Sequence, residues 1–331
     1  MMKTILHPIS QKILADFQPR KTKAQKQAFI DWLIPALAEE GIDMRIESQG
    51  WIFKSSNLIV GSPDNCEFVL GAHYDTAPVL PFPNFIIPRN LLLTLLIQMV
   101  MMLFPLFVWG ALVSWTSSLV ANIPEFLSIL LRAGVPLLYF AMLFLGPTNK
   151  HTANDNTSGI ITVIETMLAM EPQDRERVCF VLFDLEEAGL LGSSAFRQKH
   201  ASTMHDKILI NLDCVSDGDH LMLVMNRSAS KTPHFRENIQ SAFEKALENT
   251  AGKTFHIDSA WRSIYPSDQM GFRKSLGIAA LKKAPILGLY LDRIHTKRDV
   301  IFDAENIRII SQSLLVYTQS LAPVVMEDSE N

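Results

Sequence analysis

The chain has 331 residues, of which 30 are Lys or Arg and 34 are Asp or Glu, so its formal net charge is −4. This balance lacks the excess of cations that nucleic-acid binding requires, and we predict no nucleic-acid partner. The length is sufficient for one large α/β domain and an additional segment. The three cysteines, Cys66, Cys179 and Cys214, have no metal-ligand spacing and are interpreted as buried free thiols in a reducing compartment.

An amphipathic helix over Lys23–Glu40 is the first predicted element, because apolar residues recur there at helical spacing. Three short apolar runs further along the chain, Glu67–Leu70, Val178–Phe183 and Ile208–Ile210, suit buried parallel strands. Ile160–Leu168 has the apolar pattern of a helix and follows a turn sequence. The chain is therefore expected to contain an α/β domain.

A long apolar segment separates the first of these strands from the turn sequence at residue 154. No Asp, Glu, Lys, Arg or His occurs from Asn90 to Pro124. The runs Leu91–Val120 and Phe126–Leu145 come close to or exceed the roughly 20 residues that an α-helix needs to cross a bilayer. Ala121–Glu125 contains Asn and Pro and is the predicted turn between them.

We interpret this segment as a transmembrane helical hairpin that is inserted into one loop of the α/β domain. Arg89 and Lys150 flank its outer ends, so the positive-inside rule predicts that the domain lies in the cytoplasm. The stretch Met1–Ser10 lacks the apolar core of a secretory signal, which agrees with this orientation. The predicted domains are a discontinuous catalytic domain, residues 1–84 and 147–331, and the inserted hairpin, residues 85–146.

An alternative interpretation of the apolar segment is a cap that folds over the active site or forms a dimer interface. Arg132 favours this alternative, because an arginine in the hydrocarbon core is costly unless it reaches the surface, finds a partner or lines a cavity. The two interpretations are compatible, since a hairpin that begins beside residue 73 would also wall the catalytic cleft.

Potential metal ligands follow the predicted strands and occupy tight loops. Sites in open α/β sheets collect at the carboxyl ends of the strands, which is where these side chains are expected. Two imidazoles and three carboxylates can hold a pair of zinc ions if one carboxylate bridges the two ions. The candidate ligands are His73, Asp155, Glu187, Asp213 and His295.

The motifs around these residues resemble those of the M28 family of zinc aminopeptidases. They are His73-Tyr74-Asp75, Asn154-Asp155-Asn156-Thr157-Ser158-Gly159, Glu186-Glu187 with the following Gly189-Leu190-Leu191-Gly192-Ser193, Asn211-Leu212-Asp213, and His295-Thr296-Lys297-Arg298-Asp299. The resemblance covers roughly residues 20–78 and 147–322. It implies a three-layer α/β/α fold with a mostly parallel mixed sheet.

The resemblance also implies roles for individual residues. Asp155 would bridge the two zinc ions, with His73 and Asp213 on one ion and Glu187 and His295 on the other. Glu186 would be the general base, taking a proton from the attacking water and returning it to the leaving amine. Asp75 would orient the ring of His73 through its other nitrogen, the alternative being an ordinary turn aspartate.

One departure from the family pattern concerns the substrate pocket. The family often has Ser-Asp-His where this chain has Ser267-Asp268-Gln269, so substrate preference is expected to differ while metal binding is not. The weakly predicted substrate-binding residues are Arg262, Tyr265, Asp268 and Gln269, and a surface loop is the alternative for this stretch.

The resulting hypothesis is a membrane-attached zinc aminopeptidase that releases the N-terminal residue of a peptide. Three alternatives remain open at this point. The same scaffold could carry another amide hydrolase or a glutaminyl-cyclase-like acyl transfer. The chain could be a non-enzymatic membrane protein with a degenerate peptidase domain, although degenerate domains lose ligands and all are present. It could also be a binding module whose hairpin recruits a partner protein.

Overall fold

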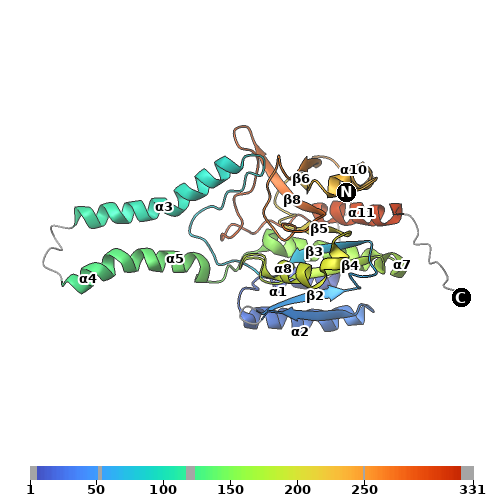
Figure 1. Ribbon diagram of the computed structural model, residues 1–331, viewed down its shortest axis with the longest axis horizontal. Helices are drawn as coiled ribbons and strands as arrows, with labels where there is room; N and C mark the ends of the chain where they lie inside the picture. Colours follow the sequence, from blue (N-terminus) through green and yellow to red (C-terminus); the bar gives the residue numbers. More distant parts are fainter. Residues whose placement is uncertain (1–5, 51–53, 117–123, 249, 322–331) are drawn as a thin grey trace, which may run out of the picture.

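The computed structural model describes residues 6–50, 54–116, 124–248 and 250–321. These residues form a mixed sheet with helices on both faces and a helical hairpin that extends away from it (Figure 1). The strand order is β1-β2-β4-β3-β5-β8-β6-β7, and β9 pairs with β8. The strands are β1 (Met44–Gln49), β2 (Ser55–Val60), β3 (Phe68–His73), β4 (Val178–Phe183), β5 (Ile208–Leu212), β6 (His220–Met225), β7 (Thr254–Ser259), β8 (Ser275–Ala284) and β9 (Gly288–Tyr290).

The four central strands, β4, β3, β5 and β8, are parallel. Strand β3 pairs with β4 so that His73 lies opposite Phe183, and with β5 so that Gly71 lies opposite Asn211. All residues of β3, β4 and β5 are buried, as the three continuous apolar runs predicted. Antiparallel pairs occur on both sides of this centre, between β2 and β4 and between β6 and β8.

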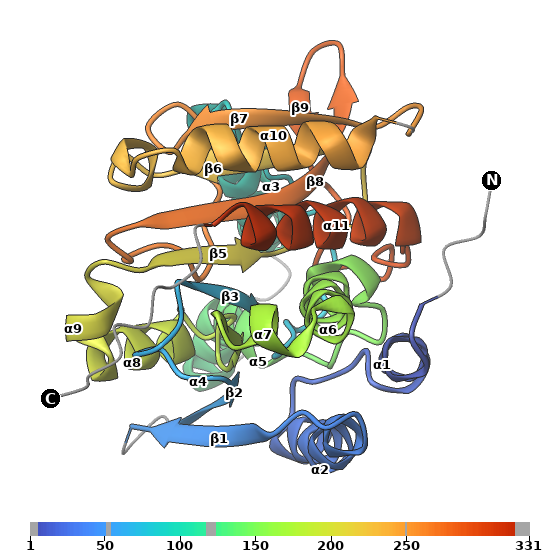
Figure 2. The ribbon, with the colours of Figure 1, turned by 90° about the vertical axis from the view of Figure 1, so that its right-hand side faces the viewer.

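Helices pack on both faces of the sheet, so the predicted three-layer α/β/α fold is confirmed. The larger core lies between the sheet and five helices, which Figure 2 shows together with the strands. These are α1 (Pro8–Asp16), α2 (Lys23–Glu39), α6 (Gly159–Ala169), α10 (Phe235–Leu247) and α11 (Ala304–Ser320). A smaller core on the opposite face includes α8 (Leu191–Lys199) and α9 (Ala201–Met204), while the short α7 (Pro172–Arg175) precedes β4.

Helix α2 illustrates how local sequence sets these elements. Thr22 accepts a hydrogen bond from the Gln25 amide, and the Gln25 side chain accepts one from the Thr22 amide. This reciprocal pair satisfies two amides that a helix start otherwise leaves free. The buried face of α2 contains Phe29, Leu33 and Leu37, which were part of its predicted apolar face.

The hairpin consists of two apolar arms that project side by side from the sheet (Figure 1). The first arm is α3 (Leu91–Trp115). The second contains α4 (Glu125–Ile129), a π-helical turn (Leu130–Gly134) and α5 (Val135–Leu145). Tyr139 of α5 donates a hydrogen bond to the carbonyl of Met102 in α3, which joins the arms. The predicted turn Ala121–Glu125 falls largely on residues 121–123, which lie outside the described residues.

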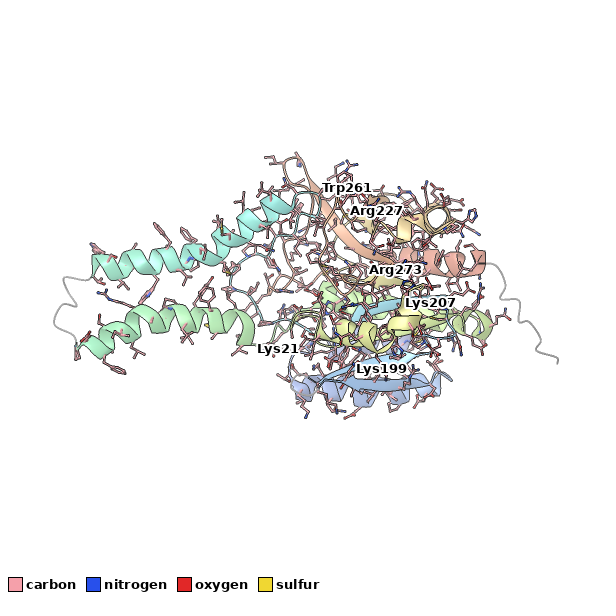
Figure 3. All side chains as sticks on the ribbon, in the orientation of Figure 1. Lys21, Lys199, Lys207, Arg227, Trp261 and Arg273 are labelled. Carbon is pink, nitrogen blue, oxygen red and sulfur yellow. The ribbon has the colours of Figure 1, made fainter. Side chains whose placement is uncertain are left out.

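Both arms are long and apolar enough to cross a membrane. The qualifying segments are Leu91–Trp115, with 25 residues, and Glu125–Leu143, with 19 residues, and their most apolar windows are 6% and 0% buried. Apolar core helices of soluble proteins are mostly buried, whereas these two windows are almost fully exposed in the structure. Figure 3 shows that the labelled cationic side chains, such as Lys199, Lys207 and Arg273, belong to the sheet unit rather than to the hairpin.

The roots of the hairpin are tied to the sheet unit by polar contacts. Arg89, just before α3, makes two hydrogen bonds to the Asp258 carboxylate at 2.7 and 3.0 Å. Thr94 in the first turns of α3 accepts a hydrogen bond from the amide of Ile87. The chain that leaves β3 also forms short antiparallel bridges, Ile86 with Leu291 and Pro78 with Thr148. These contacts fix both roots beside the carboxyl ends of the central strands.

Candidate metal centre

The parallel centre of the sheet places potential ligands from three strands at one edge. His73 is the last residue of β3, while Glu186 and Glu187 follow β4 and Asp213 follows β5. Because β3 lies between β4 and β5, His73 stands between the other two strand ends. Asp155 enters from the loop before α6, and His295 from the loop after β9. The structure therefore brings the five predicted ligands and Glu186 together.

Asp155 lies between the two imidazoles. Its Oδ1 is 3.3 Å from His73 Nε2, and its Oδ2 is 2.9 Å from His295 Nε2. Asp213 Oδ1 lies 3.5 Å from His73 Nε2, and Glu187 Oε1 lies 3.2 Å from His295 Nε2. Two ligand atoms of a tetrahedral zinc ion, each about 2.1 Å from the metal, are about 3.4 Å apart. The observed separations match that spacing.

The same atoms divide into two groups that could each hold a metal ion. One group is His73, Asp155 and Asp213, and the other is Asp155, Glu187 and His295. Asp155 belongs to both, as a bridging carboxylate must. Oε1 of Glu187 is buried without a hydrogen bond and has only the ion-pair contact with His295, so this oxygen is available to coordinate a cation. Nitrogen and carboxylate donors of this kind suit zinc, so the residues present fit the predicted metal.

Neighbouring groups orient the ligands. His73 Nδ1 lies 3.1 Å from the backbone carbonyl of Asp75, which leaves Nε2 for a metal. The Asp75 carboxylate accepts hydrogen bonds from the amides of Glu186 and Glu187 at 2.9 and 3.1 Å. Asp75 was predicted to orient His73; its backbone carbonyl makes that contact, and its carboxylate also fixes the two glutamates.

Two orienting groups were not recognised from the sequence. Asp299 accepts hydrogen bonds from the amides of Asn154 and Asp155 at 2.8 and 3.0 Å, which fixes the bridging loop. Its signal was present, since Asp299 ends the His-Thr-x-x-Asp motif. The side-chain amide of Asn84 lies 3.4 Å from Nδ1 of His295. Asn84 lies in the loop after β3 and belongs to no motif that could have indicated it.

Backbone conformation also sets the ligand positions. Leu185, Cys214 and His295 all have positive φ angles of 55–58°, although none is glycine. This left-handed conformation is uncommon for residues with a side chain and persists where surrounding structure enforces it. Each of the three is a candidate ligand or lies within two residues of one.

The electrostatics of the site favour added positive charge. Burial alone would lower the pKa of His73, but Glu186, Asp155 and Asp213 outweigh it and hold that pKa well above its ordinary value. Burial acts likewise on His295, where Glu187 and Asp155 raise the pKa. The carboxylates therefore favour positive charge at this place, which a metal ion would supply.

Glu186 lies beside His73 and Glu187 in the candidate site. Burial raises its pKa well above the ordinary value, opposed by His73 and reinforced by Glu187. A carboxyl group with a raised pKa can both accept and return a proton near neutral pH. Glu186 lines the same cavity of about 280 Å³ as the predicted ligands, so it faces the space that a substrate would fill.

The four weakly predicted substrate-binding residues are placed differently from one another. Tyr265 lines the metal cavity and also a neighbouring cavity of about 270 Å³. Gln269 lines only the neighbouring one, where its side chain accepts from Asn211 and donates to the Tyr265 carbonyl. Asp268 is buried, and burial raises its pKa to about 7. Arg262 is exposed and is not among the residues that line either cavity.

Comparison with known proteins agrees with this geometry. The model of peptidase family M28 matches residues 137–317, which is more than half of the chain, so the protein belongs to peptidase family M28. This match confirms the family predicted from the motifs. A search of curated protein sequences found no match.

Solved structures with a similar fold include glutaminyl cyclases and an aminopeptidase. The glutaminyl cyclase of Macrostomum lignano has a TM-score of 0.59 at 13% identity, covering 97% of this chain and 92% of that one. The Bacteroides thetaiotaomicron glutaminyl cyclase bound to N-acetylhistamine has a TM-score of 0.57 at 16% identity, covering 95% and 97%. The LapA aminopeptidase of Legionella pneumophila has a TM-score of 0.52 at 13% identity, covering 94% and 69%.

Arg20 is a fully buried cation close to the carboxylates of Asp75 and Asp155. Its Nε donates to the Tyr74 carbonyl at 2.6 Å, and its guanidinium also donates to Thr157 Oγ1 at 3.1 Å. Burial lowers the pKa of Arg20 to about 9, opposed by Asp75 and Asp155, so the group stays charged at neutral pH.

We expect the Arg20→Met variant to lose about 3 kcal/mol of stability in the metal-free state. The substitution leaves buried carbonyl oxygens without a hydrogen-bond donor and removes a positive charge beside the carboxylates. Chemical unfolding of the detergent-solubilised, metal-free protein measures the loss. Lys23→Met, an exposed neighbour, is the control and should change stability by less than about 0.5 kcal/mol. Equal stabilities of the two variants would contradict the assigned role.

Proposed function

We propose that this member of peptidase family M28 is a membrane-attached zinc aminopeptidase that releases N-terminal residues from peptides. The observation that carries the proposal is the position of Asp155, whose two oxygens face the two imidazoles separately. The residues proposed to hold zinc are His73, Asp155, Glu187, Asp213 and His295, with Glu186 as the general base.

Each step assigned to the chain's own residues follows from this arrangement. Zinc bound in such a site lowers the pKa of water and polarises a carbonyl oxygen. Glu186 accepts a proton from the attacking water as the new C–O bond forms, and donates it to the amine nitrogen as the C–N bond breaks. The raised pKa of Glu186 suits both transfers. Asp75 holds the backbone of Glu186 and Glu187, so the base and a ligand keep a fixed relative position.

We propose further that residues 85–146 form a transmembrane hairpin and that residues 1–84 and 147–331 form the catalytic domain. Two arms of sufficient length, and their exposure, support this arrangement. Arg89 and Lys150 at the roots support a cytoplasmic catalytic domain, because the positive-inside rule favours cations on that side.

A second candidate function is glutaminyl-cyclase-like acyl transfer. In that reaction the α-amino group of an N-terminal glutamine attacks its own side-chain amide, and ammonia leaves. The observation in its favour is coverage, because the alignment spans 92% and 97% of the two cyclase chains but 69% of LapA. The same base, Glu186, would move the proton from the attacking amine to the leaving ammonia.

Metal removal and product analysis test these proposals together. We expect a panel of aminoacyl and dipeptide substrates to release free N-terminal residues, to lose this activity on chelation, and to regain it with zinc. Mass spectrometry of an N-terminal glutamine peptide separates the candidates, since cyclisation removes ammonia and leaves the chain intact. No product of either kind from folded, zinc-loaded protein would contradict both and favour a non-enzymatic binding role.

A further inference from the structure

The metal cavity adjoins a second cavity of about 330 Å³ at the root of the hairpin. The two cavities share Asn84, Glu187 and His295, so two proposed ligands form the wall between them. The two cavities are therefore adjacent, and we call the second one the root cavity.

Both arms of the hairpin contribute to the root cavity. Gln98 and Met102 come from α3, and Leu143 comes from α5. The remaining wall, apart from the three shared residues, is apolar and comes from the loop after β3, namely Ala77, Pro78, Leu80 and Phe82. A cavity between two exposed apolar helices, with apolar residues over most of its wall and polar residues beside the metal centre, suits a molecule with a polar head and an apolar chain.

Gln98 connects the membrane arm to the metal centre. It is one of few polar residues in α3, where an unpaired amide in lipid would be costly. Its side chain donates to Asn84 Oδ1 and to the Phe85 carbonyl, each at 3.2 Å. Asn84 in turn contacts His295. The polar group of α3 therefore faces the catalytic site, while residues such as Leu103 and Phe107 stay exposed.

We propose that the substrate is an amphiphilic amide whose long alkyl chain enters from the bilayer between α3 and α5 and occupies the root cavity. The inference rests on the proposed metal-dependent amide hydrolysis and on the transmembrane hairpin. The alkyl chain of the substrate remains in apolar surroundings throughout, and only its polar amide reaches the metal centre. Hydrolysis then separates the polar head from the apolar chain.

The test compares matched short and long substrates with enzyme reconstituted in lipid nanodiscs. The preferred amino acid is supplied as its methylamide and its dodecylamide, and separately as its acetyl and dodecanoyl derivatives, so the two pairs distinguish which side carries the chain. We expect kcat/KM for one of the two long substrates, the dodecylamide or the dodecanoyl derivative, to exceed that of its short partner by about tenfold or more. Equal values in both pairs, with the short substrates cleaved, would overturn the inference and leave the proposed function intact.

Filling the root cavity provides the matched variants. Met102→Trp and Leu143→Trp should lower kcat/KM for the long substrate by about tenfold or more, and change the short one by less than about twofold. Leu103→Trp and Leu145→Trp are the controls, because neither neighbour lines the root cavity, and they should alter neither substrate. Equal losses for short and long substrates, or equal effects of cavity and control variants, would overturn the inference.

Photo-crosslinking gives a readout that does not depend on turnover. A dodecylamide with a diazirine at the end of its chain, added to metal-free and zinc-loaded protein, should label peptides that contain Met102 or Leu143. Labelling confined to the outer surface of the hairpin would overturn the inference. Labelling of the root cavity without cleavage of any substrate would instead contradict the proposed function and retain the binding site.

Discussion

The Glu186→Gln variant is expected to retain its zinc and to lose about three orders of magnitude in kcat. Glutamine has the same shape but cannot accept a proton from water, and general acid–base catalysis typically contributes about 10²–10⁴-fold. The fold should tolerate the change, because burial already disfavours the charged form of Glu186. Steady-state kinetics, with metal content determined by mass spectrometry, measure both quantities.

The control for this variant is Glu171→Gln, an exposed glutamate before α7, which should leave kcat within about twofold of the parent. If Glu186 is a base rather than a ligand, KM should change little while kcat falls. Retention of near-normal kcat would refute the assignment of the base. Loss of zinc from Glu186→Gln would instead make Glu186 a ligand, consistent with its position close to His73 and Glu187.

The sequence predicted the parts of this molecule that depend on short-range pattern. Apolar runs indicated β3, β4 and β5, and the rule that sites collect at strand ends correctly placed His73 and Asp213 together. The order of strands in the sheet could not be read in this way, because it depends on contacts between segments far apart in the chain. For example, β6 and β7 pair with each other in parallel, and nothing in the sequence of either strand indicates this pairing.

What the sequence could not indicate is mostly local support for the site. Arg20 lies far from every motif, and the sequence does not distinguish it from other basic residues near the start of α2. In the structure it is fully buried and interacts electrostatically with Asp155. The sequence around Asn84 likewise does not indicate its role, because its contact with His295 joins residues 211 positions apart. The root cavity also has no signature, because its walls come from α3, α5 and the loop after β3. Such features appear only when the chain is folded.

The Asp155→Asn variant is expected to lose both zinc ions, and activity should fall to background. Each oxygen of Asp155 faces a different imidazole, His73 at 3.3 Å and His295 at 2.9 Å. An amide replaces one of these oxygens with a group that cannot coordinate, and it removes the negative charge between two dications. Metal analysis after gel filtration, together with zinc titration calorimetry, tests this expectation.

Asp213→Asn provides the matched comparison, since Asp213 approaches only the His73 side of the site at 3.5 Å. We expect this variant to lose the ion on that side and to keep the one between Glu187 and His295, so that one ion per chain remains. The contrast distinguishes a bridging carboxylate from a terminal one, because equal charge is removed in both cases. If Asp155→Asn retained two ions, or if both variants lost the same number, Asp155 would not be the bridge and the dinuclear assignment would fail.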